Sequence, residues 1–538
     1  MKALCLPFSQ IPHTSRLFLD LLSYAPQVQS FYPRSPYFHE WLRDEAAKIS
    51  YEASRREHVT RILERQNKSW NASEKALANL ERLRNGASTV VTGQQVGLFG
   101  GPTFSLYKAL SAVKLANEAT AAGVEAVPVF WLATYDHDLA EVNHISLPAA
   151  DGTLAVLTTP SKDVPGAPVS SVRFGDEINP VVEQAAALLG DTEASQDLRD
   201  SYRPGESLGT AFARLYARIF ADWGVILLDP SDPEFDRVAQ PIYRAAIERA
   251  DELAASLLDR GQKLEAAGYH QQVKVTDSSV LLFTTRKGAR TPISRRAAEF
   301  VVDGEAAAEK LSQSQLLAEV DSHPERFSPN VLLRPIMQDF LLPTLAYTGG
   351  SAEAAYFAQA GVVYEALLDR VTPILPRFSA TIMEPKAQRL LEKHEVAITD
   401  VFDGPEALRQ QIAAKQLPRD LQTAFDSAKN SFDANFSAVK DNLEKLDKTL
   451  VDAAETARSK MQHQLEKLYA QAARAEALKG ELVSRHAEIL SQALYPNKGL
   501  QERTLGGSYF LSRYGQELLH QLYDTINSSC HDHQIIEV

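Results

Sequence analysis

Acidic and histidine side chains crowd into residues 136–144, as Asp136-His137-Asp138 followed by Glu141 and His144. Two carboxylates that flank an imidazole can bind a substrate ammonium or transfer a proton. Two histidines with a carboxylate are also a common metal-ligand set. In a purely structural alternative, Asp138 caps the next helix and the His144 side chain packs within the fold. We predict catalytic roles for Asp136, His137 and Asp138, and substrate contacts for Glu141 and His144, without a bound metal.

A glycine-rich stretch precedes this cluster. Residues 89–108 read TVVTGQQVGLFGGPTFSLYK, an apolar run that passes through a glycine-rich turn into a helix. Glycine lets the backbone approach a phosphate, and the first N–H groups of the helix point at it. The stretch has neither a Gly-Lys-Ser/Thr nor a G-x-G-x-x-G signature, and a tight structural turn is the alternative. We predict that Gly93, Gly97, Gly100 and Lys108 bind a cofactor.

A second strand-to-helix turn with paired glycines lies at residues 342–356. Ser351 stands at a cap position and Glu353 in the first turn of the helix. A plain capped helix start would explain this pattern, but a second glycine-rich junction also suits a second wall of a ligand site. We predict substrate contacts for Tyr347, Gly349, Gly350 and Glu353.

A hydroxyl-rich loop between two cations follows at residues 377–386. Its arginine and lysine suit the charge of a phosphate or a carboxylate, although such a pair is often ordinary surface charge. We predict that Arg377 binds substrate and that Ser379 and Lys386 bind the cofactor.

The elements around these residues indicate a parallel sheet. A strand at 88–92, a helix from about 103 to 122 and a continuously apolar strand at 127–133 form a βαβ unit. Ligands of open α/β sheets bind beyond the carboxyl ends of the strands, so the acidic cluster and the glycine-rich turn should be neighbours. Short alternating runs at 145–175 and 271–300 are typical of small β-rich insertions.

The segment between Pro418 and Gly480 contains neither proline nor glycine. Its apolar residues recur in steps of four and three, as in a coiled-coil seam. Asp452 and Glu455 have capping-box spacing, so we expect two antiparallel helices hinged near 447–452. An ordinary amphipathic helix pair is the alternative.

Composition narrows the class of protein. The 538 residues are 44% apolar and 23% charged, with a net charge of −13, which suits a globular protein and argues against nucleic-acid binding. Cys5 and Cys530, near opposite ends, build no disulfide framework or zinc cluster, as expected in the reducing cytoplasm. No apolar run approaches a membrane span of ~20 residues, and G-x-S-x-G and H-E-x-x-H motifs are absent.

Three strings together resemble the BshC family, the proposed cysteine ligase of bacillithiol biosynthesis. They are 92–102 with Tyr107-Lys108, 128–131 with 136–144, and 342–344 with 349–353; the string Leu500-Gln-Glu-Arg503 also looks like that family. The resemblance covers the whole chain. It implies an enzyme that joins L-cysteine to the amine of glucosaminyl malate, with a Rossmann-like core of the nucleotidyltransferase and class I synthetase kind, two connecting insertions and a coiled coil that forms a homodimer.

The resemblance suggests a division of the chain into seven parts. They are 1–144, first half of the core; 145–215, first insertion; 216–270, core; 271–330, second insertion; 331–417, second half of the core; 418–490, antiparallel coiled coil; and 491–538, a segment packing back on the core.

The resemblance also implies a mechanism. ATP, with Mg²⁺ as a possible companion, would activate the cysteine carboxyl as an adenylate or a phosphate ester for attack by the amine. Gln94 and Gln95 stand where class I synthetases carry histidines, and we predict that they take part in catalysis. Two other classes stay open: a metal-dependent hydrolase or transferase using the Asp136–His144 cluster, and a non-catalytic nucleotide-binding coiled-coil protein.

Overall fold

The computed structural model describes residues 2–159, 166–303, 308–415, 417–477 and 480–538. The chain forms two compact units, and each is described by itself. The first comprises Met1–Ala150, Leu154–Ala380 and Glu502–Ile536; the second comprises Asp151–Thr153, Thr381–Gln501 and Glu537–Val538. Within the described ranges, no helix combines the length and the apolar character that crossing a membrane requires.

A five-stranded parallel sheet forms the centre of the first unit. Its order is β13-β12-β2-β3-β6, and all its neighbours run parallel. The first strand in sequence lies in the middle, so the strand order reverses between β2 and β12, as in a Rossmann-like fold. The predicted α/β class is confirmed. The strands are β2 (Ser88–Gln94), β3 (Ala126–Leu132), β6 (Ile226–Leu228), β12 (Thr344–Gly349) and β13 (Ile374–Pro376).

Helices cover both faces of this sheet. Successive side chains of β2 point to opposite faces: Val90 packs with Leu115 of α5 (Phe104–Ala121), whereas Val91 belongs to the cluster formed with helices on the other face. Burial on both sides explains the continuously apolar sequence of β3. Helices of the second face include α3 (Ala53–Ser69), α4 (Glu74–Arg84), α10 (Pro233–Glu248), α11 (Ala250–Ala266) and α14 (Ser351–Leu368).

Two β-rich stretches interrupt the core sequence, near the predicted positions. The first is the hairpin of β4 (His144–Pro148) and β5 (Leu154–Thr158), followed by α7 (Ile178–Leu189), α8 (Glu193–Ser201) and α9 (Leu208–Ile219). The second is an antiparallel sheet ordered β10-β9-β8-β7-β11. Its members are β7 (Ser279–Arg286), β8 (Ala289–Arg296), β9 (Glu299–Val302), β10 (Glu309–Leu311) and β11 (Phe327–Pro329), with α12 (Gln313–Ser322).

Shorter elements complete the first unit. They are α1 (Arg16–Leu22), α2 (Leu42–Ala47), α6 (Leu139–Val142), α13 (Arg334–Leu341), α20 (Gln501–Thr504), α21 (Gly507–Tyr514), α22 (Glu517–Thr525), β1 (Lys2–Leu6) and β15 (His533–Glu537). β1 and β15 are neighbours in a small sheet, which brings the two ends of the chain together.

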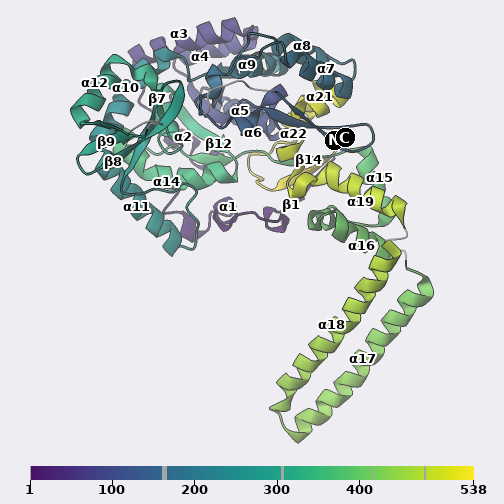
Figure 1. Ribbon diagram of the computed structural model, residues 1–538. Coiled ribbons are helices and arrows are strands. Elements are labelled where there is room, and N and C mark those ends of the chain that lie inside the picture. Colours follow the sequence, from purple (N-terminus) through teal and green to yellow (C-terminus); the bar gives the residue numbers. More distant parts are fainter. Residues whose placement is uncertain (1, 160–165, 304–307, 416, 478–479) are drawn as a thin grey trace. The chain divides into compact units, whose positions relative to one another are not determined.

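The second unit is helical apart from β14 (Ala380–Met383). It contains α15 (Pro385–His394), α16 (Pro405–Lys415), α17 (Arg419–Leu446), α18 (Leu450–Ala477) and α19 (Glu481–Leu494). α17 and α18 lie side by side as a long hairpin (Figure 1). Lys440 pairs with Glu455 at 2.5 Å and Asp433 with Arg458 at 2.9 Å, an order that only antiparallel helices allow.

The hinge of the hairpin falls at residues 447–449, in agreement with the prediction. Asp447 makes the turn, because its Oδ1 accepts hydrogen bonds from the backbone N–H and the hydroxyl of Thr449, both at 2.8 Å. Asp452, the predicted capping residue, instead lies inside α18, which begins at Leu450. The long segment of the second unit begins at residue 381 and ends at residue 501. The sequence placed these two changes at 417–418 and 490–491; the difference arises because α15 and α16 pack with α19.

Candidate active site

A cavity of ≈ 680 Å³ opens at the carboxyl ends of β2, β3 and β12, inside the first unit. This is the point where the strand order reverses, the usual ligand site of such sheets. Its lining includes five cationic side chains, Lys108, Arg290, Arg334, Arg377 and Arg503, and three carboxylates, Asp136, Glu141 and Glu353. A chain with a net charge of −13 therefore concentrates positive charge here, which suits an anionic ligand.

Lys108 ties the glycine-rich turn to the second glycine turn. From the second turn of α5, its ammonium donates to the Gly93 carbonyl at 2.7 Å and to Oε1 of Gln94 at 2.9 Å, and lies 2.6 Å from Oε2 of Glu353. Burial lowers the pKa of Lys108 to about 8, although the Glu353 carboxylate opposes this shift. Gly93 is required by close packing, because a Cβ there would lie 3.3 Å from Trp131 and from the Tyr347 hydroxyl.

Glu353 organises the start of α14. Its Oε2 accepts from the Gly350 backbone N–H at 2.8 Å, and its Oε1 accepts from the Tyr347 hydroxyl at 2.5 Å. Burial opposes ionisation, but Lys108 and these hydrogen bonds hold the pKa of Glu353 below its usual value. Gly350 is the N-cap residue, in place of the predicted Ser351. Gly349 lies just outside the lining of the cavity. A Cβ atom at position 349 would come within 2.9 Å of the Cβ atom of Glu353.

The acidic cluster contributes two carboxylates to the cavity. Nε2 of Gln95 donates to Oδ2 of Asp136 at 2.7 Å and to Oε2 of Glu141 at 2.6 Å, so the two acids converge on one amide. His137 is exposed, and its Nδ1 lies 3.3 Å from Nη1 of Arg290. A pair of carboxylates with hydrogen-bond capacity left over can bind an ammonium or accept its proton.

Arg377 reaches the cavity from the end of β13. Its Nη2 lies 2.5 Å from Oε1 of Glu502, and its guanidinium stands 5.3 Å from the centre of the Phe104 ring. Both charges of this ion pair are buried. The Arg377 guanidinium holds the pKa of Glu502 below its usual value against the effect of burial.

Three further arginines of the lining were not predicted as site residues. Arg290 arrives from β8, where burial lowers its pKa to about 10. Arg334 begins α13 and lies over the rings of Trp131 and Tyr347, at 5.9 Å and 5.3 Å from their centres. Arg503 follows Glu502 and lies inside the string 500–503, which resembles a family motif. That resemblance was the one sequence feature that pointed to Arg503 as a site residue.

Several predicted residues lie outside the lining of this cavity. Asp138 is exposed at the N-cap of α6 without a capping hydrogen bond, and Nδ1 of His144 contacts the Ala140 carbonyl. Gly100 bonds to Tyr202 and Tyr216, so this end of the glycine turn packs against α9. His137 and Gly349 also lie outside it, as do Gly97, whose Cβ position is filled by Gly101; Ser379, whose hydroxyl bonds Nδ1 of His533; and Lys386, on α15 of the second unit.

The Asp136–His144 cluster was also an open metal-site candidate. In the part of the chain that the structure describes, histidine, cysteine and carboxylate side chains do not gather in threes that could hold a metal ion. The structure gathers Asp136 and Glu141 around Gln95 and turns Asp138 and His144 elsewhere.

Comparison with known families decides the assignment. Residues 1–378 match the family model described as "Bacillithiol biosynthesis BshC, N-terminal Rossmann-like domain", and residues 380–538 match "Bacillithiol biosynthesis BshC, C-terminal coiled-coil domain". The chain belongs to the BshC family. The resemblance seen in the sequence is thereby confirmed, and the break between the two BshC domains falls where the chain passes between its two compact units.

BshC relatives match over the full length. A protein of Koribacter versatilis (strain Ellin345) is 49% identical over 534 residues, 99% of each chain, and one of Solibacter usitatus (strain Ellin6076) is 35% identical over 542 residues, all of each chain. A third, of Salinibacter ruber (strain DSM 13855 / M31), is 33% identical over 97% of this chain and 96% of its own. Each bears the name "Putative cysteine ligase BshC", which agrees with the predicted ligase class.

Proposed function

We propose that this protein is a cytoplasmic ligase that joins the carboxyl of L-cysteine to the amine of glucosaminyl malate. The observation that carries the proposal is the charge pattern of the cavity, in which two convergent carboxylates face a surplus of guanidinium groups. Both substrates carry an amine, and glucosaminyl malate also carries two carboxylates. A site for this reaction must therefore bind ammonium and carboxylate groups together, and this lining has partners for both.

Asp136 and Glu141 are our candidates for the amine. Gln95 fixes both carboxylates by donating one hydrogen bond to each. The remaining lone pairs can orient a substrate ammonium and accept the proton that it must lose before attack. His137 is a positioning residue in this scheme, because it contacts Arg290 and lies outside the lining.

Arg377 and Arg503 are our candidates for the malyl carboxylates, with Arg334 at the start of α13. Glu502 already occupies one end of the Arg377 guanidinium and thereby fixes its plane. Guanidinium groups bind carboxylates in a two-point geometry that fixes orientation as well as charge. Lys108 is almost wholly buried and fully engaged with Gly93, Gln94 and Glu353, so it acts by holding the turn in place.

The lining also fits the phosphates of ATP. Cationic groups exceed acids by two among the charged lining residues, five against three. Gln94 and Gln95 would hold the nucleotide, accompanied by Mg²⁺. ATP would supply a leaving group for the cysteine carboxyl. Gly97, Gly100, Ser379 and Lys386 receive no role, because they lie outside the lining.

The proposal is tested with the purified full-length chain. Cysteine, glucosaminyl malate and ATP should yield one amide product, detected by mass spectrometry, together with stoichiometric nucleotide cleavage. Omitting any one reactant should abolish the product. Failure to form the amide with all three present, or formation without nucleotide cleavage, would contradict the ligase and the ATP requirement respectively.

We also propose that the hairpin of α17 and α18 forms a homodimer. Apolar side chains lie exposed along it, including Val439, Met461 and Leu468, each about half exposed. A second copy would bury them. Sedimentation should give twice the mass of 59.4 kDa, and Val439→Glu with Leu468→Glu should return the monomer mass; a monomeric wild type contradicts the proposal.

A further inference from the structure

The chain has two cysteines, Cys5 and Cys530, and the fold brings them into contact although 525 positions separate them. Their sulfur atoms lie 3.6 Å apart, and both are free thiols. Their pairing could not be predicted from the sequence, because residues near opposite ends of a chain have no expected proximity. The contact arises from the pairing of β1 with β15.

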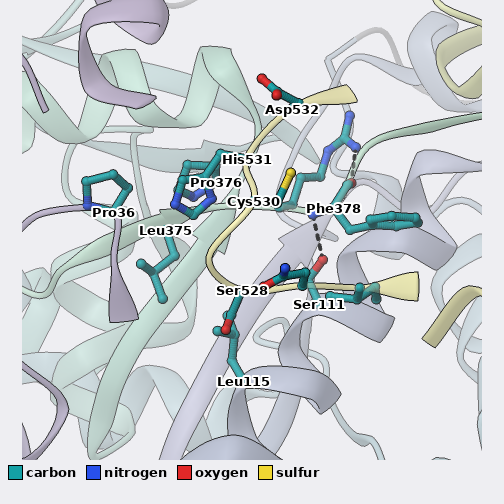
Figure 2. A pocket seen from close by; sticks show the side chains of 13 residues that line it. Pro36, Ser111, Leu115, Leu375, Pro376, Phe378, Ser528, Cys530, His531 and Asp532 are labelled. Atoms are coloured by element: carbon teal, nitrogen blue, oxygen red, sulfur yellow. Dashed lines mark hydrogen bonds between the residues drawn. The ribbon is translucent and has the colours of Figure 1, made fainter. Parts of the chain in front are cut away.

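The surrounding backbone holds both thiols in place. Cys5 is exposed on β1, and Cys530 lies half-buried, three residues before β15. The Cys530 backbone N–H donates to the Asn527 carbonyl at 3.0 Å, which closes a turn. This turn borders a pocket that is lined by Ser111 of α5 and Phe378 together with Cys530, His531 and Asp532 (Figure 2). The His531 ring lies 5.5 Å from that of Tyr37, which anchors the far side of the turn.

We propose that Cys5 and Cys530 form a reversible disulfide that links the first strand of the chain to the segment before the last, with a small-molecule disulfide as oxidant. The thiolate of one cysteine attacks the small disulfide, forms a mixed disulfide and expels one small thiol. The other cysteine then attacks the protein sulfur of the mixed disulfide and expels the second. Two electrons pass from the protein to the oxidant, and the two protein protons end on the two released thiols.

The geometry leaves a short distance to close. A disulfide bond measures about 2.05 Å, so the two sulfurs must approach by about 1.5 Å from their present contact. Cys5 is exposed and Cys530 is half-buried, so a small oxidant can approach the pair from the side of Cys5. Burial, the Cys530 thiol and Asp532 raise the pKa of Cys5, which lowers its thiolate fraction and slows its attack on an oxidant. The inference does not depend on the proposed ligase activity.

The test uses the full-length protein in buffers of reduced and oxidised glutathione, followed by alkylation, intact mass and peptide mapping. Oxidation should remove two hydrogens from the chain, protect both cysteines from alkylation together and yield one cross-linked peptide pair containing Cys5 and Cys530. Dithiothreitol should reverse these changes. A persistent glutathione adduct on the wild type, a cross-link between two chains, or thiols that stay alkylatable in the most oxidising buffer would each overturn the proposal.

Matched variants separate this disulfide from other oxidation. Cys5→Ser and Cys530→Ser should each lose the two-hydrogen change and carry a glutathione adduct on the remaining cysteine. Oxidised wild type should also unfold at a higher temperature than reduced wild type, because the cross-link closes a loop of nearly the whole chain. The serine variants should unfold at the same temperature in both buffers; a wild-type midpoint that does not rise contradicts the link between the two ends.

Discussion

The ammonium of Lys108 lies 2.6 Å from Oε2 of Glu353, and this contact joins two helices that begin at the ends of adjacent strands. α5 follows β2 and α14 follows β12, so the ion pair spans the point where the strand order reverses. The side chains are 4% and 14% exposed. Neither charged group is solvated by bulk water, so each is stabilised by the opposite charge of its partner.

Removing one member of this pair should therefore be costly. We expect Lys108→Met to lower the free energy of unfolding by about 3 to 5 kcal/mol, because Glu353 keeps a buried charge without its partner. Glu353→Gln should also destabilise the protein. The double variant should lose less than the sum of the single variants, as measured by urea unfolding. Additive losses would show that the two side chains do not act as a pair.

The depressed pKa of Lys108 predicts a pH dependence of stability. Its pKa is about 8 in the folded protein and 10.5 for an unperturbed lysine. Between these values the unfolded chain binds the proton and the folded protein does not, so stability from this group rises with pH, by up to about 1.4 kcal/mol per pH unit. Urea unfolding should be measured for wild type and Lys108→Met across that pH window. The free energy of unfolding of wild type should rise with pH relative to that of Lys108→Met. A difference that does not change with pH would contradict the lowered pKa.

Asp136 and Asp138 offer a matched pair of substitutions two residues apart. Asp136 faces the cavity and binds Gln95, whereas Asp138 is exposed outside it. Asp136→Asn should lower kcat of the proposed ligase by roughly 100-fold or more, since proton transfer is lost. Asp138→Asn should change kcat by less than about twofold, as for an ordinary surface position. Steady-state kinetics measure kcat of both variants. An equal loss of kcat in Asp136→Asn and Asp138→Asn would contradict our placement of the site.

Arg503 tests the anion-binding wall. Arg503→Gln should raise KM for glucosaminyl malate by roughly 30-fold, corresponding to the loss of about 2 kcal/mol from one charge-assisted hydrogen bond. Its KM for cysteine should change much less, because the role of Arg503 is to bind the malyl group. Arg503→Lys should restore part of the binding. A change confined to kcat, with both KM values unaltered, speaks against this assignment.

The sequence predicted the sheet because its strands carry strong local signals. The apolar run 127–133 and the turn after Gly93 indicated a parallel sheet with a ligand site at its edge, and the structure has the parallel sheet and a cavity at that edge. The hinge of the helix hairpin was predicted close to its place, although the capping-box spacing of Asp452 and Glu455 that suggested it lies inside α18.

Other parts of the site depend on contacts between distant segments. Arg290 and Arg334 reach the cavity from the second sheet and from α13, where no local pattern distinguishes them from surface arginines. Lys386 looked equivalent to Arg377 in sequence, but the chain enters the second unit between them. Asp138 and His144 are near Asp136 in sequence, yet Asp138 is the N-cap of α6, His144 begins β4, and both lie outside the lining of the cavity. Such outcomes follow from tertiary packing, which motif spacing does not encode.

The ion pair of Arg377 and Glu502 has a consequence for synthesis on the ribosome. Arg377 emerges 125 residues before its counter-ion, after every strand of the parallel sheet has left the exit tunnel. A nascent chain that closed its core at that stage would enclose a guanidinium without a carboxylate. Completion of the core therefore waits for translation of almost the entire message, and products that stop short of residue 502 should be recognised by proteases as unfinished.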